Sequence, residues 1–248
     1  MRDIEWCIAY LKGINHIREL PDIDEWALFR ALLNITMPID LSEEFYRRQD
    51  AVLQGRLQNQ RIIDISVFPM GIFLYKGDIT LLKADAIVNA CNSQMLGCFK
   101  PGHHCIDNAI HSFGGLEIRR DLMKVMDEQG HDEPNGQCKV SEGYNLPAKY
   151  VLHTVGPVYS GRKQDDFDLA NCYISCLQKA DEMGLKNVVF CSLSTGIFGF
   201  PIEKACKIAI KNAKNYLKHE SKNIERVVFD VFSEEDYGTY ARALKETD

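Results

Sequence analysis

Residues 187–219 read NVVFCSLSTGIFGFPIEKACKIAIKNAKNYLKH, and the fold prediction starts from this stretch. Its first part is a short apolar run, which is typical of a buried strand. Its last part begins near Pro201 and places apolar residues three or four positions apart, at Ile202, Cys206, Ala209, Ala213 and Leu217. That spacing predicts an amphipathic helix whose apolar stripe faces the core. The stretch therefore predicts a strand, a loop and a helix in succession.

The same alternation runs through the sequence from about residue 66 onward. Further strands are expected at residues 66–80, 84–92, 150–159 and 226–233. Further helices are expected at residues 105–115, 116–130, 168–184 and 235–246. Strands that alternate with helices are typical of an α/β protein in which helices cover both faces of a sheet.

The N-terminal part of the chain shows helical signals only. Helices are expected at residues 4–14, 24–36 and 41–60. Ser42 is the candidate N-cap of the last one, and Glu43 and Glu44 suit the positive end of its dipole. We therefore divide the chain into a helical N-terminal extension, residues 1–68, and an α/β domain, residues 69–248.

The composition excludes several classes of protein. The chain has 248 residues, 46% of them hydrophobic and 26% charged, as in ordinary globular proteins. Its net charge of -6 disfavours binding to duplex nucleic acid. It has neither a signal-peptide core nor a run of about 18 uncharged apolar residues, so we expect a cytoplasmic protein that binds no membrane. Nine cysteines, an odd number, are expected to be reduced. We also expect a monomer.

Two loops that follow predicted strands carry polar motifs. In α/β folds, ligands bind at the loops at the carboxyl ends of strands. The first loop reads GDIT and contains Asp78, although Gly-Asp is also common in turns where Asp caps the next segment. The second contains Asn89 and Asn92, whose amide groups suit the hydroxyl groups of a sugar or form a local turn.

A third loop, STGIFGFP at residues 194–201, joins the strand and the helix of the opening stretch. Its two glycines let the backbone approach a ligand closely, and backbone amides near a helix N-terminus bind anions. It matches neither the Walker A motif nor GxGxxG. The loop is therefore a candidate phosphate site, and the alternative is a plain connection between strand and helix.

Together, GDIT (77–80), VNACN (88–92), HTVGP (153–157) and STGIFGFP (194–201) resemble, in this order and spacing, the motifs of the macrodomain family. The resemblance covers roughly residues 69–245 and implies a three-layer α/β/α fold with a mixed central sheet that binds ADP-ribose. It implies that Asp78 accepts a hydrogen bond from the adenine amino group and that Ile79 lines the same pocket. Asn92 would contact the distal ribose and Phe232 would stack on adenine. The diphosphate would be bound by the backbone of Ser194, Thr195, Gly196, Ile197, Phe198 and Gly199.

Residues 97–108 read GCFKPGHHCIDN, where many macrodomains have a glycine-rich run. Cys98, His103 and Cys105 offer two thiolates and an imidazole, a donor set suited to Zn²⁺. His104 is an alternative or an additional ligand, although consecutive side chains point apart. Three ligands favour a catalytic zinc over a structural zinc, which normally has four. The segment looks like that of zinc-containing macrodomains that act as protein-ADP-ribose hydrolases and also carry an N-terminal helical extension.

Asp107 lies at the start of a predicted helix, where an acidic residue commonly interacts with the helix dipole. In hydrolytic macrodomains an acid near this position faces the distal ribose, so the resemblance implies that Asn92 and Asp107 are catalytic. The expected function is a zinc-dependent hydrolase that removes mono-ADP-ribose from modified protein side chains, with an ester to Asp or Glu as the favoured linkage. Attack at C1″ and attack at the ester carbonyl both stay open. The alternative functions are a non-catalytic ADP-ribose-binding module and an O-acetyl-ADP-ribose deacetylase.

Overall fold

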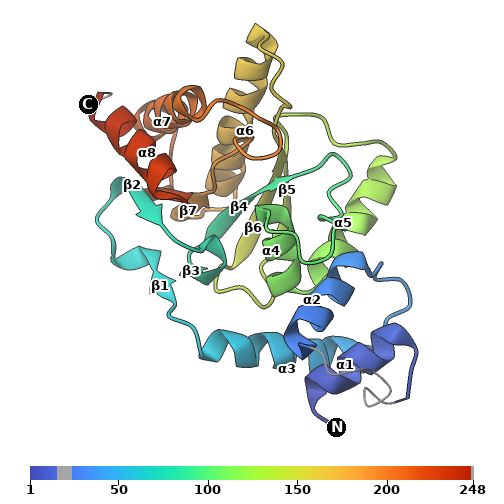
Figure 1. The fold of residues 1–248 in the computed structure, drawn as a ribbon. Helices are drawn as coiled ribbons and strands as arrows, with labels where there is room; N and C mark the ends of the chain where they lie inside the picture. The colour runs from blue at the N-terminus through green and yellow to red at the C-terminus, as the bar shows by residue number, and fades with distance from the viewer. Residues whose placement is uncertain (16–23, 247–248) are drawn as a thin grey trace.

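The computed structural model describes residues 1–15 and 24–246. Its main feature is a six-stranded sheet with the strand order β2-β8-β7-β4-β6-β5 (Figure 1). All neighbouring strands are parallel except β5 and β6, so the sheet is mixed, as expected. In that order the strands are β2 (Gly71–Lys76), β8 (Arg226–Val231), β7 (Asn187–Phe190), β4 (Ala86–Cys91), β6 (Tyr150–Val155) and β5 (Cys138–Glu142).

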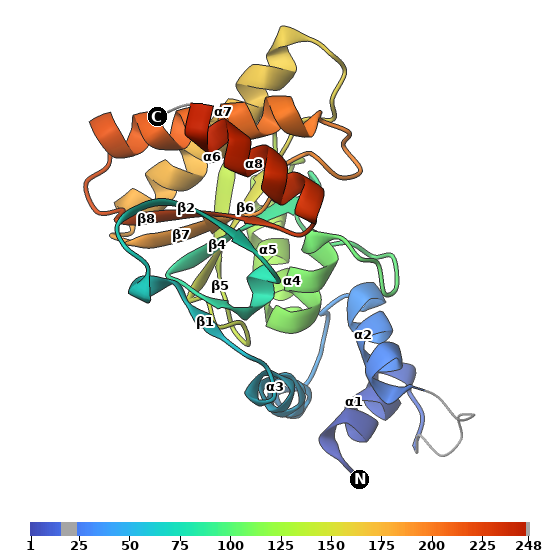
Figure 2. The same ribbon diagram turned by 60° about the vertical axis from the view of Figure 1, so that its left-hand side comes forward.

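Helices cover both faces of this sheet, which confirms the three-layer α/β/α prediction. Helices α4 (Ile106–Gly114) and α5 (Leu116–Gln129) contact β4 and β5 on one face. Helices α6 (Lys163–Glu182), α7 (Ile202–His219) and α8 (Glu234–Glu246) pack side by side on the other (Figure 2). No helix within the described ranges is long and apolar enough to cross a membrane.

The predicted apolar stripe of α7 is confirmed as core. Cys206, Ala209 and Ala213 have no exposed surface, and Ile202 and Leu217 pack against the same hydrophobic cluster. The central strands β4, β7 and β8 are buried on both faces, as parallel strands between two helical layers must be. Cys191, one of nine free thiols, packs among them as a small apolar side chain.

The N-terminal extension is helical, as expected, with α1 (Asp3–Lys12), α2 (Glu25–Ile35) and α3 (Glu43–Gln58). Among them α2 contacts α4, and all three lie at the opposite side of the molecule from α7 and α8 (Figure 1). They enclose a second hydrophobic cluster, to which α5 contributes Leu116. Ser42 caps α3 as predicted, because its hydroxyl oxygen accepts a hydrogen bond from the Phe45 N–H.

Three local features differ from the sequence expectation. The stretch 66–80 contains one strand between two 3₁₀ turns. Pro69, which cannot donate to a sheet ladder, lies before this strand, and Asp78 caps the turn after it. The edge strand β5 and the two-residue pair β1 (Ile63–Asp64) and β3 (Leu82–Lys83) were not expected. Strand β5 is too polar to show an apolar pattern, and β1 and β3 are too short to show one. The boundary at 68/69 stays a prediction, although Ile65 already belongs to the larger cluster.

Candidate functional site

The parallel strands bring the predicted ligand-binding loops to one edge of the sheet. Lys76 of β2 pairs with Val231 of β8, so Asp78 and Phe232 follow neighbouring strands at nearly the same level. Val88 of β4 pairs with Phe190 of β7, so Asn92 and Ser194 each lie four residues beyond a paired position. This arrangement is the one in which α/β proteins bind ligands across strand ends.

Asp78 has a structural role in its own loop, and its contact with adenine stays a prediction. Its Oδ1 accepts hydrogen bonds from the Thr80 N–H (2.9 Å) and hydroxyl (2.6 Å), which caps the 3₁₀ turn Ile79–Leu81. No described residue donates to its Oδ2, which leaves that oxygen for a ligand. Ile79 is 2% exposed, so its side chain belongs to the core beneath this edge.

The loop between β7 and α7, residues 191–201, has the form of an anion site. Among the described residues, no backbone carbonyl accepts from the N–H groups of residues 195–198. The loop is closed by hydrogen bonds from Gly199 N to Gly196 O and from Phe200 N to Ser194 O. A Cβ added at Gly196 would meet no atom within 4 Å, so the space beside this residue is open. These amides also lie just ahead of the N-terminus of α7.

Asn92 and Phe232 differ in their exposure to solvent. Asn92 is half-buried and organises its own loop, since its Nδ2 donates to Gly97 O (3.1 Å) and its Oδ1 accepts from Gln94 N (3.1 Å). Phe232 directly follows β8 and is 85% exposed, so its ring is available for stacking. The ribose contact of Asn92 and the adenine contact of Phe232 stay predictions.

The three predicted metal ligands converge. We call residues 92–105, between β4 and α4, the cysteine loop. The donor atoms of Cys98, His103 and Cys105 all lie within 4.8 Å of one another, and Cys98 Sγ is 3.5 Å from His103 Nδ1. In a tetrahedral zinc site, neighbouring sulfur and nitrogen ligands lie about 3.6 Å apart, so the donor set and its spacing fit Zn²⁺. His104 is exposed and outside this group.

Asp107 lies in the first turn of α4 and is 5% exposed. Its Oδ1 accepts a hydrogen bond from Asn89 Nδ2 at 2.8 Å. Burial raises the pKa of this carboxyl to about 6, against the opposing effects of the Asn89 hydrogen bond and the charge of Arg119. The Asp107 side chain is therefore fixed by a hydrogen bond from β4, and interaction with the dipole of α4 is not its only role.

Asn89 and His153 form a buried hydrogen-bonded pair behind Asp107, a contact between the two residues that the sequence analysis did not predict. They pair directly across β4 and β6, and Asn89 Nδ2 lies 3.1 Å from His153 Nδ1. Burial lowers the pKa of His153 to about 3, so the ring is neutral and its Nδ1 accepts from the amide. His153 Nε2 then donates to Ser141 Oγ at 2.9 Å. This chain fixes the Asn89 amide so that it donates to Asp107. The only sequence signal was the presence of both residues in the family motifs.

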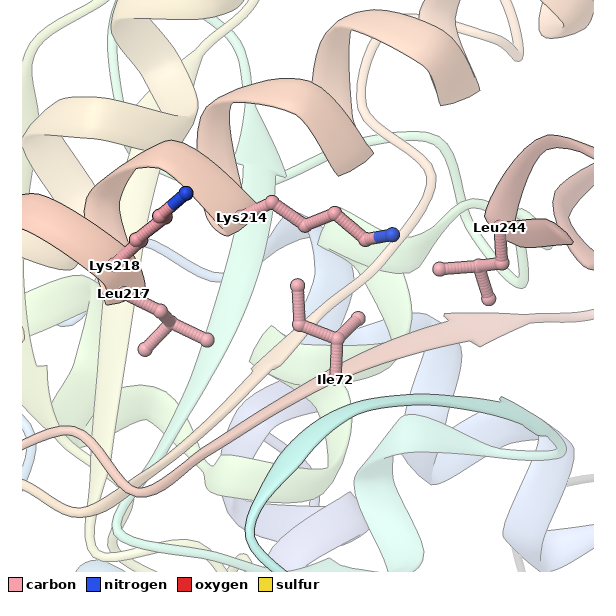
Figure 3. A pocket seen from close by; sticks show the side chains of 5 residues that line it. All are labelled: Ile72, Lys214, Leu217, Lys218 and Leu244. Carbon is pink, nitrogen blue, oxygen red and sulfur yellow. The ribbon is translucent and has the colours of Figure 1, made fainter. Parts of the chain in front are cut away.

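A depression of about 450 Å³ elsewhere on the molecule is unrelated to these residues (Figure 3). Ile72 at the start of β2 forms its floor, beneath side chains from the second half of α7 and the end of α8. The α7 and α8 residues are Lys214, Leu217, Lys218 and Leu244. None of the predicted site residues lines it, and Ile72 lies at the opposite end of β2 from Asp78.

Comparison with known proteins agrees with this architecture. The family model described as Macro domain matches residues 88–209, from β4 to the first half of α7. The chain is 43% identical to a protein-ADP-ribose hydrolase of Treponema medium over an alignment of 251 residues that covers 96% of this chain and 96% of that one. It is also 43% identical to a protein-ADP-ribose hydrolase of Staphylococcus aureus over an alignment of 228 residues that covers 89% of this chain and 85% of that one.

A solved structure shows the same fold. The Trypanosoma brucei macrodomain in complex with ADP-ribose is 30% identical, with a TM-score of 0.69 over 87% of this chain and 94% of that one. The fold, the family model and the identity over nearly the full length thus agree, and the chain belongs to the macro domain family.

Proposed function

We propose that this protein is a zinc-dependent hydrolase that removes mono-ADP-ribose from modified protein side chains, with an ester to Asp or Glu as its linkage. The relatives that share 43% identity are named protein-ADP-ribose hydrolases. The observation that carries the proposal is the convergence of Cys98, His103 and Cys105 in the loop directly before Asp107. An ADP-ribose-binding module needs neither the donor set nor the buried carboxylate.

The binding part of the proposal uses the strand-end loops. Asp78 Oδ2 would accept from the adenine amino group, with Phe232 stacked on the ring. The amides of residues 195–198 would bind the diphosphate without any cationic side chain, as anion-binding loops at helix N-termini do. Asn92, the first residue of the cysteine loop, would orient the distal ribose.

The hydrolytic part uses the cysteine loop and Asp107. Zn²⁺ held by Cys98, His103 and Cys105 would supply a Lewis acid with one position open to an oxygen ligand. Asp107 Oδ1, held by Asn89, would orient the nucleophile or take its proton. Since proximity and orientation lower the barrier strongly, a carboxylate fixed by a hydrogen bond is more effective than a mobile one.

The test compares three variants on an acceptor protein that carries mono-ADP-ribose on a carboxylate side chain. Cys98→Ala should lose zinc and nearly all release of ADP-ribose, yet still bind ADP-ribose. Asp107→Asn should keep zinc and slow release by about 10²–10⁴-fold, as expected for the loss of a general base. Cys138→Ala, a half-buried cysteine on β5 outside the loop, is the matched control and should keep both.

Other outcomes would identify the alternatives. A wild-type protein that binds ADP-ribose tightly but releases none from any acceptor is a binding module. Release only from acceptors modified on arginine or serine would contradict the ester linkage. Efficient turnover of O-acetyl-ADP-ribose, with none of the modified protein, would favour the deacetylase.

A further inference from the structure

Helix α2 of the N-terminal extension makes direct polar contacts with the cysteine loop. Asn34, which is 1% exposed, accepts a hydrogen bond on its Oδ1 from the Gly102 N–H at 2.9 Å. One turn earlier on the same helix, Arg30 Nη2 donates to the carbonyl oxygen of His103 at 3.1 Å. Residues more than 65 positions apart in the chain are thereby joined at the segment that holds the metal donors.

Arg30 also acts on the loop through Asn108. Its Nη2 donates to Asn108 Oδ1 at 2.9 Å, which turns the other end of that amide toward the cysteine loop. Asn108 Nδ2 then donates to the carbonyl oxygens of Lys100 (3.0 Å) and Cys98 (3.3 Å). The backbone at two of the three donor residues, Cys98 and His103, is therefore positioned by Arg30 either directly or through one amide.

A buried arginine on α5 ties the end of α2 to the same loop. Arg119 is 1% exposed and donates to the carbonyl oxygens of Leu33 and Thr36 at the end of α2. It also donates to the Leu96 carbonyl at 2.6 Å, and its guanidinium lies 4.5 Å from the ring centre of Phe99. The loop is thus held near its start, its middle and its last donor residues.

From these contacts we infer that the N-terminal extension positions the metal donors, with Arg30 and Asn34 as positioning residues that set the zinc affinity. The inference rests on the proposed function, which assigns zinc to Cys98, His103 and Cys105. A loop without helix or strand loses conformational entropy when three of its side chains must converge. Contacts that hold the donor side chains close together before the metal binds remove part of this entropy cost. Residues that hydrogen-bond to metal ligands have the same effect in other metal sites.

The extension contains a matched control for Asn34. Gln49 on α3 is likewise a buried amide, 0% exposed, that accepts from a backbone N–H at 2.9 Å, here that of Leu116. Its Nε2 donates to Glu117 at 2.8 Å, as Asn34 Nδ2 donates to Ser112 at 2.8 Å. Both residues join the extension to the α/β domain, but only Asn34 contacts the cysteine loop.

The experiment measures zinc affinity by competition with a chromophoric chelator for the full chain and for Asn34→Leu, Gln49→Leu and Arg30→Met. We expect Asn34→Leu and Arg30→Met to bind zinc about 10- to 100-fold more weakly, the usual effect of losing a partner behind a metal ligand. Gln49→Leu should destabilise the fold to a similar extent in denaturant and keep the wild-type zinc affinity. Cobalt absorption should change in the first two variants only, because it reports ligand geometry.

The outcomes separate the inference from the proposed function. A wild-type chain that binds no zinc overturns the metal assignment, on which the inference depends. Wild-type zinc binding with unchanged affinity in Arg30→Met and Asn34→Leu overturns the inference alone. Equal loss of zinc affinity in Gln49→Leu would also overturn it, since general loosening of the interface would then suffice. Should Asn34→Leu fail to fold, Arg30→Met decides, because Met keeps the apolar stem of a half-buried residue.

Discussion

Asp230 is a buried carboxyl group close to Asp78. It is 6% exposed, and its Oδ1 has no hydrogen-bond partner among the described residues. Burial is the largest cause that raises its pKa, to about 8, and the negative charge of Asp78 adds to the effect. Asp230 is therefore protonated at neutral pH in the folded chain, whereas in the unfolded chain it ionises near pH 4.

This difference predicts a pH-dependent contribution to stability. Between about pH 4 and pH 8 the folded state holds a proton that the unfolded state has lost, so this group lowers stability as pH rises, by about 1.4 kcal/mol per pH unit. Asp230→Asn removes the titration, so its advantage over wild type should grow across that window and level off above it. Denaturant unfolding at a series of pH values measures the difference. A difference that does not change with pH would contradict the assignment.

A second carboxylate provides a control of opposite sign. Hydrogen bonds from Lys149, Lys186 and Asn187 lower the pKa of Asp85 despite partial burial. The contribution of ionised Asp85 to stability is present at pH values above its pKa in the unfolded chain, and it is lost as the pH falls through its pKa in the folded chain. Asp85→Asn should therefore cost stability at neutral pH and little in acid.

At the scale of elements, the β7–α7 loop shows how a strand and a helix create a binding site between them. β7 is buried on both faces and α7 is fixed by its apolar stripe, so the loop between them is held at both ends. Gly199 has a φ of 67°, a left-handed conformation that favours glycine and closes the turn. The amides of residues 195–198 are left without a backbone acceptor among the described residues.

The prediction for this element is that side chains at Gly196 block diphosphate binding without affecting the fold. No atom lies within 4 Å of a Cβ at Gly196, so Gly196→Ala and Gly196→Glu should both unfold like wild type. Affinity for ADP-ribose, measured by calorimetry, should fall moderately for alanine and below detection for glutamate, which adds both bulk and a negative charge. Normal binding by Gly196→Glu would place the phosphates elsewhere.

At the scale of the whole molecule, the two hydrophobic clusters do not include the residues of the proposed metal site. The larger cluster spans both faces of the sheet, and the smaller one lies within the extension and reaches α5 at Leu116. Cys98, His103 and Cys105 belong to neither cluster. Folding therefore depends on apolar surface that does not include these three side chains.

Removal of zinc should leave a folded chain. In chelator, far-UV circular dichroism at 25 °C should stay unchanged and unfolding should stay cooperative. The loss of stability should equal the mass-action term alone, about 4 kcal/mol at a zinc concentration of 1,000 times Kd. Collapse of the helical signal on chelation would instead indicate a structural zinc, because the binding energy of such a metal is folding energy.

The sequence by itself determined the features that contiguous residues encode. A short apolar run identified the strand at residues 187–190, which is buried on both faces. Apolar periodicity identified the stripe of α7, because burial on one face of a helix repeats at the helical period. The spacing of Cys98, His103 and Cys105 predicted that their donor atoms converge, because a short loop is able to bring residues this close together in sequence to one point. Ser42 was recognisable as a cap for the same reason, since its hydrogen-bond partner lies three residues away.

Only the tertiary structure decided which distant side chains meet. Asn89 and His153 are paired by the register of β4 and β6, which a buried apolar pattern does not specify for individual polar residues. Arg30 and Asn34 reach the cysteine loop because α2 packs against α4, and nothing near them in sequence distinguishes them from other polar residues of a helix. Hydrogen bonding is local in space, so a partner 64 or more residues away becomes visible only after the core has placed both elements.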